Sequence, residues 1–346
     1  MKMSNIAVIV AAVIAFAVTG IIGKWFIPYL RKIKYGQNII EEYGPTWHKT
    51  KQGTPTMGGF MFIIGTTAAV IVAFVIYALS FDASEYPELK TQMLIRVAIT
   101  FCMALAFGFL GFVDDYIKVV KKRNMGLTSK QKFVMQLVIG TAYLAGMFIT
   151  EKLFAEPSTT MLIPFLNIEL DLGIFYYPFA LFIIVGFVNA VNLTDGIDGL
   201  ASSVTFVAAA GMMSIAAILS RTDAGILSSA LAGGTLGFLI WNFYPAKVFM
   251  GDTGSMFLGG MVVGICFIIN KPLLLILVGI VYLVETLSVM MQVTSYKLTK
   301  KRIFKMTPIH HHFEMSGYSE IKIVILFSAV TVVGVALAII SVLTTM

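Results

Sequence analysis

The sequence has few charged residues and few cysteines, and both shortages narrow the class of protein. Only 12% of its 346 residues are charged, whereas 58% are hydrophobic. A soluble domain carries about a quarter charged residues, so this composition is typical of a polytopic membrane protein. A long polar block is also missing, which argues against a sizeable domain outside the membrane. We therefore expect one transmembrane domain over residues 1–346.

The two cysteines, Cys102 and Cys266, both lie in apolar runs, without the C-x-x-C or Cys–His spacing of a zinc site. We expect both to be packing residues. The first apolar run, residues 6–27, is too long for the core of a signal peptide. Cations follow it instead of a small-residue cleavage site, so we predict a spanning helix there.

Ten apolar segments are candidates for crossing a bilayer, which takes about 20 mostly apolar residues. They cover residues 6–27, 57–79, 93–113, 133–149, 174–191, 201–219, 226–243, 256–269, 273–293 and 323–343. The eighth is the shortest, and Pro272 after it predicts a tight turn because proline cannot continue a helix with full bonding. The predicted fold class is all-α, with a small hairpin over the alternating residues 161–172 of one loop.

The cations predict how the segments are oriented. If the loop after the first segment lies in the cytoplasm, 19 of the 25 Lys and Arg residues fall on that side. Cytoplasmic loops carry such an excess, so we predict ten helices with both termini outside. If the eighth segment did not span the bilayer, the basic run 297–305 would lie on the outer side. The excess of Lys and Arg on the cytoplasmic side would then be much smaller. Because topology accounts for most of the net charge of +7, we expect no nucleic-acid partner.

Asp114 and Asp115 close the third apolar segment. A charged helix end is the simple alternative, but carboxylates there face the unfavourable end of the helix dipole. They also lie at the apolar edge, where an unpaired ion is costly and usually functional. We therefore favour a functional role, with Lys118, Lys121 and Lys122 following at helical spacing as candidate ion-pair partners.

Residues 192–199 connect two helices with two acids and no cation. Asp195 and Asp198 are three residues apart, so a helical turn projects both in one direction. Gly196 and Gly199 allow the backbone to approach a ligand closely. Alternatively, one of the acids, Asp198, caps the next helix.

Residues 242–255 form the third acidic break. Asp252, Thr253 and Ser255 precede the apolar run that starts at residue 256. Hydroxyls, free backbone N–H groups and the positive end of a helix dipole together predict a phosphate cradle. Phe249 could stack on a nucleobase or anchor the chain at the membrane interface.

Three consecutive histidines, His310, His311 and His312, lie in a fourth break. Consecutive residues do not share a helical face, which disfavours a triple-histidine zinc site. Hydrogen bonds to phosphate oxygens or proton shuttling suit these side chains better. Glu285, inside the ninth segment, is either a functional intramembrane carboxylate or a brace between helices.

The segment 51–59 contains lysine, threonines and glycines at a helix start. Lys51 and Thr56 there suit an anion, and an N-cap with a proline turn explains the pattern equally well.

Together these stretches resemble a known family. The Asp-Asp pair, NLTDGIDGLA, FMGDTGS and PIHHHFE resemble the polyprenyl-phosphate N-acetylhexosamine-1-phosphate transferases, in the same order and with the same ten-helix plan. PIHHHFE and KxGTPTMGG resemble the bacterial branch of phospho-N-acetylmuramoyl-pentapeptide transferases.

The resemblance implies a reaction and its partners. Phospho-MurNAc-pentapeptide moves from UDP-MurNAc-pentapeptide to undecaprenyl phosphate, giving lipid I and UMP in peptidoglycan synthesis, with Mg²⁺ required. The enzyme would work in the bacterial plasma membrane, as a multi-pass protein in the lipid bilayer with its site on the cytoplasmic face. A homodimer is expected by analogy only.

The resemblance also implies site residues. The catalytic set is Asp114, Asp115, Asp252, His310, His311 and His312, with Asp252 and Asp115 as metal ligands. The substrate-binding set is Lys51, Thr56, Lys118, Lys122, Lys130, Asn192, Asp195, Gly196, Asp198, Asn242, Phe249 and Gln292.

Two mechanisms remain open at this stage. The lipid phosphate attacks directly, with Asp114 as a candidate base, or a covalent aspartyl-phosphate forms first. Among other classes, an ion-coupled transporter also uses broken helices, but its site lies near the bilayer midplane. An intramembrane aspartyl protease fails because Phe249 stands where the Gly-x-Gly-Asp motif of such proteases needs its first glycine.

Overall fold

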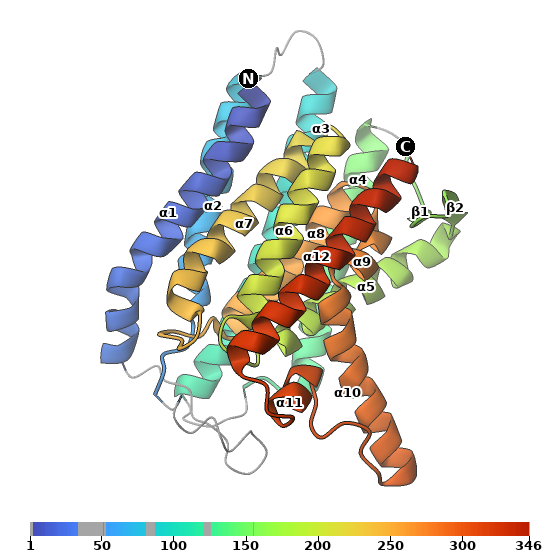
Figure 1. The fold of residues 1–346 in the computed structure, drawn as a ribbon. Helices are drawn as coiled ribbons and strands as arrows, with labels where there is room; N and C mark the ends of the chain where they lie inside the picture. Colours follow the sequence, from blue (N-terminus) through green and yellow to red (C-terminus); the bar gives the residue numbers. More distant parts are fainter. Residues whose placement is uncertain are drawn as a thin grey trace.

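The computed structural model describes residues 3–33, 51, 53–80, 87–120, 126–154 and 156–345. In these ranges the chain is an all-α bundle with one two-stranded hairpin (Figure 1). The helices are α1 Met3–Lys32, α2 Gly59–Ser80, α3 Pro87–Val120, α4 Ser129–Phe154, α5 Tyr176–Thr194, α6 Leu200–Ile218, α7 Thr222–Asn242, α8 Gly251–Ile268, α9 Leu275–Val278, α10 Ile280–Thr299, α11 Ile309–Glu314 and α12 Glu320–Thr344. Of the helices described, nine are long and apolar enough to span a membrane, or up to ten if α9 and α10 form one bent span.

The helices extend beyond the apolar runs, and this changes the setting of the acids. We predicted that Asp114 and Asp115 close a helix, but α3 continues past them to Val120. Lys118, four residues after Asp114, forms an ion pair with it at 2.6 Å and supports the extra turn. The α8 helix begins at Gly251 rather than at residue 256, so Asp252 lies in its first turn.

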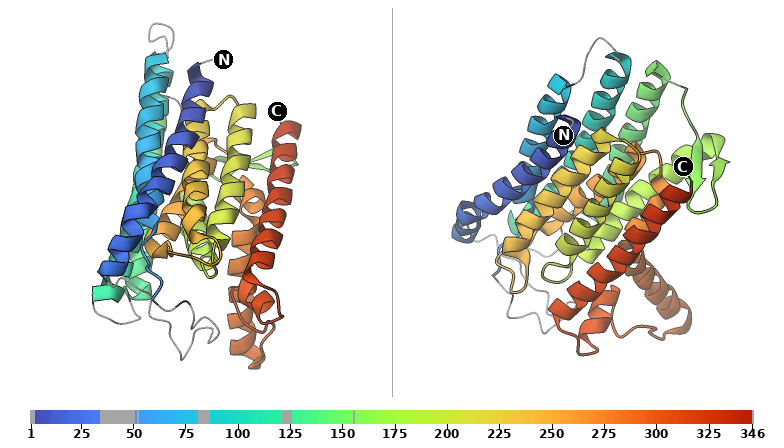
Figure 2. Two further views of the ribbon diagram at one scale, coloured as in Figure 1. Left: turned by 60° about the vertical axis from the view of Figure 1, so that its left-hand side comes forward. Right: turned by 45° about the horizontal axis from the view of Figure 1, so that its top comes forward.

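The ninth predicted span, residues 273–293, is not one continuous helix but a bent pair. A short 3-10 turn and α9 are followed by α10 at an angle of 83°, and α10 leans away from the bundle (Figures 1 and 2). The break lies at Gly279, where a Cβ atom would stand 2.7 Å from the carbonyl oxygen of Leu275 and 2.8 Å from the ring of Phe187. A residue with a side chain does not fit between these neighbours, and glycine also weakens the helix at this point.

The α8 helix is the centre of the bundle. Buried residues make up 89% of its membrane-spanning window, compared with 28% for α1 at the periphery. Both α3 and α5 pack along α8. A helix that is apolar all round is expected in such a central place. Because the start of α8 carries Asp252, its burial brings this carboxylate against the ends of α3 and α5.

Both termini lie at the same end of the bundle, together with the hairpin (Figures 1 and 2). The strands β1 Thr160–Ile163 and β2 Ile168–Asp171 pair antiparallel, which confirms the predicted hairpin. The loop between them is fastened to α12, since the Phe165 N–H donates to Ser341 Oγ at 3.0 Å. Termini at one end agree with an even number of crossings. The short helix α11 lies at the opposite end (Figure 1).

Candidate active site

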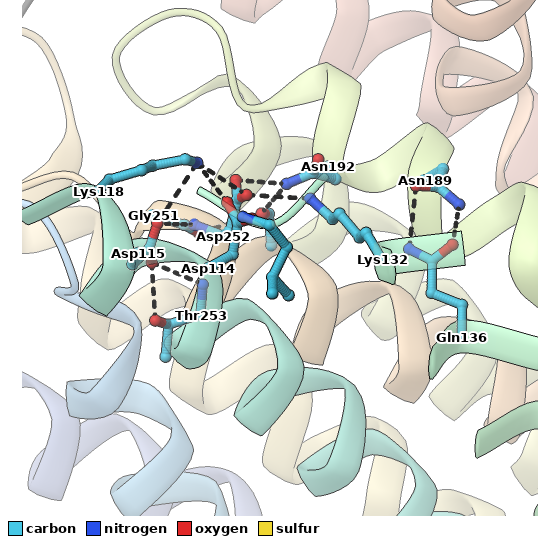
Figure 3. A network of polar contacts seen from close by, with 12 residues as sticks. Asp114, Asp115, Lys118, Lys132, Gln136, Asn189, Asn192, Gly251, Asp252 and Thr253 are labelled. Carbon is cyan, nitrogen blue, oxygen red and sulfur yellow. Dashed lines mark hydrogen bonds and ion pairs between the residues drawn. The ribbon is translucent and has the colours of Figure 1, made fainter. Parts of the chain in front are cut away.

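Three carboxylates from two helices form one cluster at the end of the bundle opposite the termini. Asp114 and Asp115 of α3 and Asp252 of α8 each offer an oxygen atom, and these atoms lie within 4.8 Å of one another. Figure 3 shows the cluster. Two of the acidic breaks that we singled out in the sequence therefore meet in space, because α3 packs along α8.

Asp115 binds the first turn of α8. Its Oδ1 accepts the N–H of Asp252 at 3.2 Å, and its Oδ2 accepts the N–H and hydroxyl of Thr253 at 2.9 and 2.8 Å. We predicted that these backbone groups were free to hold a phosphate, and this was wrong. A carboxylate satisfies unpaired N–H groups and is stabilised by the helix dipole. Gly251 (φ 70°) permits this contact, since a Cβ there would crowd Asp115 and the hydroxyl of Thr56.

Asp252 is the acid of the cluster that bonds to both lysines. Its Oδ1 accepts from Asn192 Nδ2 at 2.9 Å, and its Oδ2 accepts from Lys118 and Lys132, each at 3.0 Å. The two lysines approach it from opposite sides (Figure 3). Three carboxylates thus face two ammonium groups. When all are ionised, the cluster carries one negative charge and attracts a further cation.

Lys132 is a site residue that we did not identify from the sequence. We named Lys130, whose side chain is exposed, whereas the half-buried Lys132 reaches Asp252. Residues two apart on a helix point in nearly opposite directions, so only one of the pair can face the cluster. The sequence around them does not say which one. Lys122, also in our predicted set, lies outside the described residues.

The segment after residue 125 closes over Asp114. The Leu127 N–H donates to Asp114 Oδ1 at 2.8 Å, while Lys118 binds Oδ2. A Cβ atom at Gly126 would crowd the same carboxylate. This contact also went unpredicted, because Gly126 and Leu127 carry no chemistry of their own.

The 192–199 connection places one acid near the cluster and uses the other elsewhere. Asn192 joins Asp252 to Ser255, whose Oγ it contacts at 2.8 Å. Burial, and then the charge of Asp252, raise the pKa of Asp195 to about 8. Asp198 does not cap α6. It accepts from Lys51 at 2.7 Å and from the Ala246 N–H at 2.8 Å.

We expect Asp195→Asn to remove a pH-dependent loss of stability in the metal-free protein. Folded Asp195 keeps its proton up to about pH 8, whereas the unfolded chain releases it near pH 4. Wild-type stability therefore falls between these values, and the advantage of the variant should grow by about a few degrees in Tm from pH 5 to pH 8. Thermal unfolding in detergent measures it.

Asp171→Asn on β2 is the matched control for this pH series. The Thr159 hydroxyl and the Gly173 N–H lower the pKa of Asp171, so its contribution is present above its ordinary pKa and is lost in acid. A Tm advantage of Asp195→Asn that is the same at pH 5 and pH 8 would refute the raised pKa.

Lys51 belongs to a second cluster, which joins three segments. Besides Asp198, its ammonium group binds Glu320 Oε2 at 2.6 Å, at the start of α12. The carboxylate of Glu320 also accepts the Asp198 N–H at 2.9 Å. Glu320 was not among the predicted residues. The ion pairs occupy Lys51 in the form described, so a phosphate that binds it has to share it with two acids.

Three other residues that we predicted to contact the substrate form hydrogen bonds that hold loops in place. Asn242 donates to the Val248 carbonyl at 3.0 Å, and Gln292 accepts the N–H of Phe304 at 3.0 Å. Phe249 is half-buried, and its main chain bonds to residues 55 and 58. These bonds occupy Asn242 and Gln292 with the protein's own main chain and leave the ring of Phe249 partly accessible.

The three histidines point to three different partners. In α11, the Nδ1 atom of His310 lies 3.0 Å from Glu285, and that of His311 lies 2.5 Å from Glu314. His312 Nδ1 accepts the N–H of Lys305 at 3.2 Å. Among the described residues, the acidic cluster is the only group of His, Cys, Asp and Glu side chains spaced for a metal ion.

A helical membrane bundle with lysine-flanked carboxylates at one end is the architecture of a membrane enzyme that handles phosphate. Comparison with known sequences agrees: residues 97–270 match the profile described as "Glycosyl transferase family 4". This range contains the whole acidic cluster.

Similarity to individual proteins extends over nearly the whole chain. The phospho-N-acetylmuramoyl-pentapeptide-transferase of Clostridium perfringens (strain SM101 / Type A) is 47% identical over 326 residues, 94% of each chain. Those of Listeria welshimeri and Listeria monocytogenes (strain EGD-e) are each 46% identical over 327 residues, covering 94% of this chain and 95% of theirs. The chain therefore belongs to the phospho-N-acetylmuramoyl-pentapeptide-transferase family, as its motifs led us to expect.

Proposed function

We propose that this protein transfers phospho-MurNAc-pentapeptide from UDP-MurNAc-pentapeptide to undecaprenyl phosphate, releasing UMP and forming lipid I for peptidoglycan synthesis. The observation that carries the proposal is the Asp114–Asp115–Asp252 cluster with its two lysines, in a chain so similar to transferases of this name. Both substrates carry phosphates, and phosphoryl transfer depends mainly on positioning and on stabilisation of negative charge.

The donor set of the cluster fits Mg²⁺. This ion prefers oxygen ligands and usually binds one or two carboxylates together with substrate phosphates. Asp252 and Asp115 would hold it, since they belong to the group of oxygens that approach within 4.8 Å. When bound, the ion would neutralise phosphate charge and orient the transferred group. Its two charges would turn the net charge of the cluster from negative to positive.

Lys118 and Lys132 have a matching task in the proposed reaction. Their ammonium groups already lie 3.0 Å from Asp252. The three ionised aspartates and two lysines leave one negative charge unbalanced, and a diphosphate bound beside Asp252 adds further negative charge. The two ammonium groups stabilise this added charge. Asn192 holds Asp252 in place by its bond to Oδ1. Neither lysine has to form a covalent bond for this role.

Direct attack by the lipid phosphate is the mechanism that we favour. All six carboxylate oxygens of Asp114, Asp115 and Asp252 already accept a hydrogen bond or pair with a lysine. A nucleophilic aspartate would have to release one of these partners first. The lipid phosphate is an anion and needs no such release. Trapping a phosphoryl-enzyme with the UDP donor alone would reverse this preference.

The setting follows from the topology that we predicted. With the cation-rich loops in the cytoplasm, the end that carries the acids and α11 faces the cytoplasm, where the soluble UDP donor is available. The lipid acceptor explains why the site belongs at the edge of the bilayer of a bacterial plasma membrane. Assembly as a homodimer remains an expectation by analogy.

The direct test is the release of UMP by purified protein. We expect release with Mg²⁺, UDP-MurNAc-pentapeptide and undecaprenyl phosphate together. Omitting the lipid, or chelating the metal with EDTA, should each lower the rate by about 10²-fold or more, because the acceptor or the compensating charge is then missing. Equal UMP release without the lipid would indicate a hydrolase, and full activity in EDTA would refute the metal role.

A further inference from the structure

Glu285 is the buried carboxylate whose role the sequence left open. It lies in α10 with no exposed surface, and its Oε1 is 3.0 Å from Nδ1 of His310. The same carboxylate reaches the N–H of His310 with Oε2, at 3.5 Å. The side chain of His310 is also fully buried. Glu285 therefore contacts both the ring and the main chain of this histidine.

The other ring nitrogen of His310 is unusual. Nε2 is buried and has no hydrogen-bond partner among the described residues. A buried polar atom without a partner is costly, and such atoms in native proteins call for an explanation. A carboxylate opposite Nδ1 favours a proton on that nitrogen, which leaves Nε2 with a free lone pair.

Nε2 lies against the connection that leads to the acidic cluster. A Cβ atom at Gly196 would overlap Nε2, so the main chain of this turn directly abuts the ring. Four residues earlier in the same connection, Asn192 binds Asp252. The turn at Asp195 and Gly196 thus has the histidine on one side and is joined to the carboxylates on the other.

We propose that Glu285 is a positioning residue that acts through His310. It keeps the proton on Nδ1, so that Nε2, which the Gly196 main chain covers in this structure, accepts a hydrogen bond from the UDP-linked donor when binding of that ligand shifts the Asn192–Gly196 turn. The partner is a hydroxyl or amide N–H group of the nucleotide sugar, because a lone pair cannot accept from a phosphate oxygen. This inference rests on the proposed function, because it takes the ligand to be the UDP-linked donor of that reaction.

Of the neighbouring ionisable groups, two are bound to other partners in the described structure. His311, whose ring centre is 4.1 Å from that of His310, is paired with Glu314. At the start of α12, Glu320 is bound to Lys51. Asp195 precedes Gly196 in the turn, and burial raises its pKa to about 8, so at neutral pH it is mainly protonated and can itself serve the same ligand.

The test compares Glu285→Gln with Glu285→Asp. Glutamine has nearly the same shape, but its NH₂ group can donate to Nδ1 and so favour the wrong tautomer. We expect the KM for the UDP donor to rise about 30-fold in Glu285→Gln, with the KM for undecaprenyl phosphate unchanged. Glu285→Asp should recover part of the loss, because it restores the carboxylate.

Tyr282→Phe is the matched control for packing. Tyr282 is buried one turn earlier in α10, where its hydroxyl bonds to Thr205 at 2.7 Å. Loss of this hydroxyl group should lower Tm and leave the KM values for the UDP donor and for undecaprenyl phosphate unchanged. The proposal is overturned if Glu285→Gln leaves the donor KM unchanged, or if it raises both KM values together with a drop in Tm like that of Tyr282→Phe.

A second measurement does not depend on activity. ¹⁵N-histidine spectra of the wild type should show a proton on Nδ1 of His310 and a bare Nε2. His310→Gln identifies the signal among the four histidines of the chain. In Glu285→Gln, the proton should move to Nε2. A wild type that carries its proton on Nε2 overturns the inference, whereas a wild type that releases no UMP overturns the proposed function.

Discussion

Replacing Asp252 by asparagine is expected to lower Mg²⁺-dependent UMP release by about 10³-fold or more. The carboxylate is the one acid that bonds to both lysines and to Asn192. An amide carries no charge to hold a cation, and its NH₂ group would meet either an ammonium group or the Asn192 amide. The change therefore removes metal affinity and disorders the lysines at once.

The control for Asp252→Asn is the same substitution at Asp171. Asp171 is exposed on β2, at the end of the bundle opposite the cluster. Its replacement should leave the rate within about twofold, as usual for a surface site. Membrane insertion and Tm of both variants need to be compared with the wild type. If Asp252→Asn keeps more than about a tenth of the activity at saturating Mg²⁺, the metal role fails.

Lys132→Gln is expected to cost about 10²-fold in kcat/KM. Its ammonium group is half-buried and lies 3.0 Å from Asp252, so its loss leaves the three acids with Lys118 alone. Two uncompensated negative charges then repel the diphosphate of the donor, and in a partly buried site water screens them poorly. The KM for the donor should therefore rise along with the fall in kcat.

Lys130→Gln tests the geometry directly, because Lys130 lies two residues away on the same helix and is exposed. Its loss removes the same charge from the same end of α4 without touching Asp252. We expect a change within about threefold, due to long-range charge only. A loss at Lys130 as large as that at Lys132 would mean that overall charge, not the contact with Asp252, accounts for the effect.

Much of this protein was readable from its sequence because membrane proteins are constrained locally. A bilayer demands long apolar helices, so the all-α class with nine to ten candidate spans, and the hairpin, followed from hydropathy and alternation. The acids in the breaks stood out because ions at an apolar edge are costly. Asp114, Asp115 and Asp252 were recognised in this way, without knowledge of their distances.

Only the tertiary structure could decide contacts between segments far apart in the chain. It brought Lys132 rather than Lys130 to Asp252, because the facing side of α4 depends on how that helix packs. In the structure Asp115 binds the first turn of α8, where we expected a phosphate. This could not be predicted, because no local pattern reveals which distant group binds the end of a helix.

Composition and order along the chain thus determined the membrane class, the helices and the acids at the breaks, since each depends on local burial in lipid. Tertiary packing alone decided three other features: the bend at Gly279, the contact of Glu285 with His310, and the ion pairs of Lys51 with Asp198 and Glu320. Each joins residues separated by many turns of helix or needs a close approach of two helices. Such contacts depend on how whole helices fit together, and local sequence carries little information about that fit.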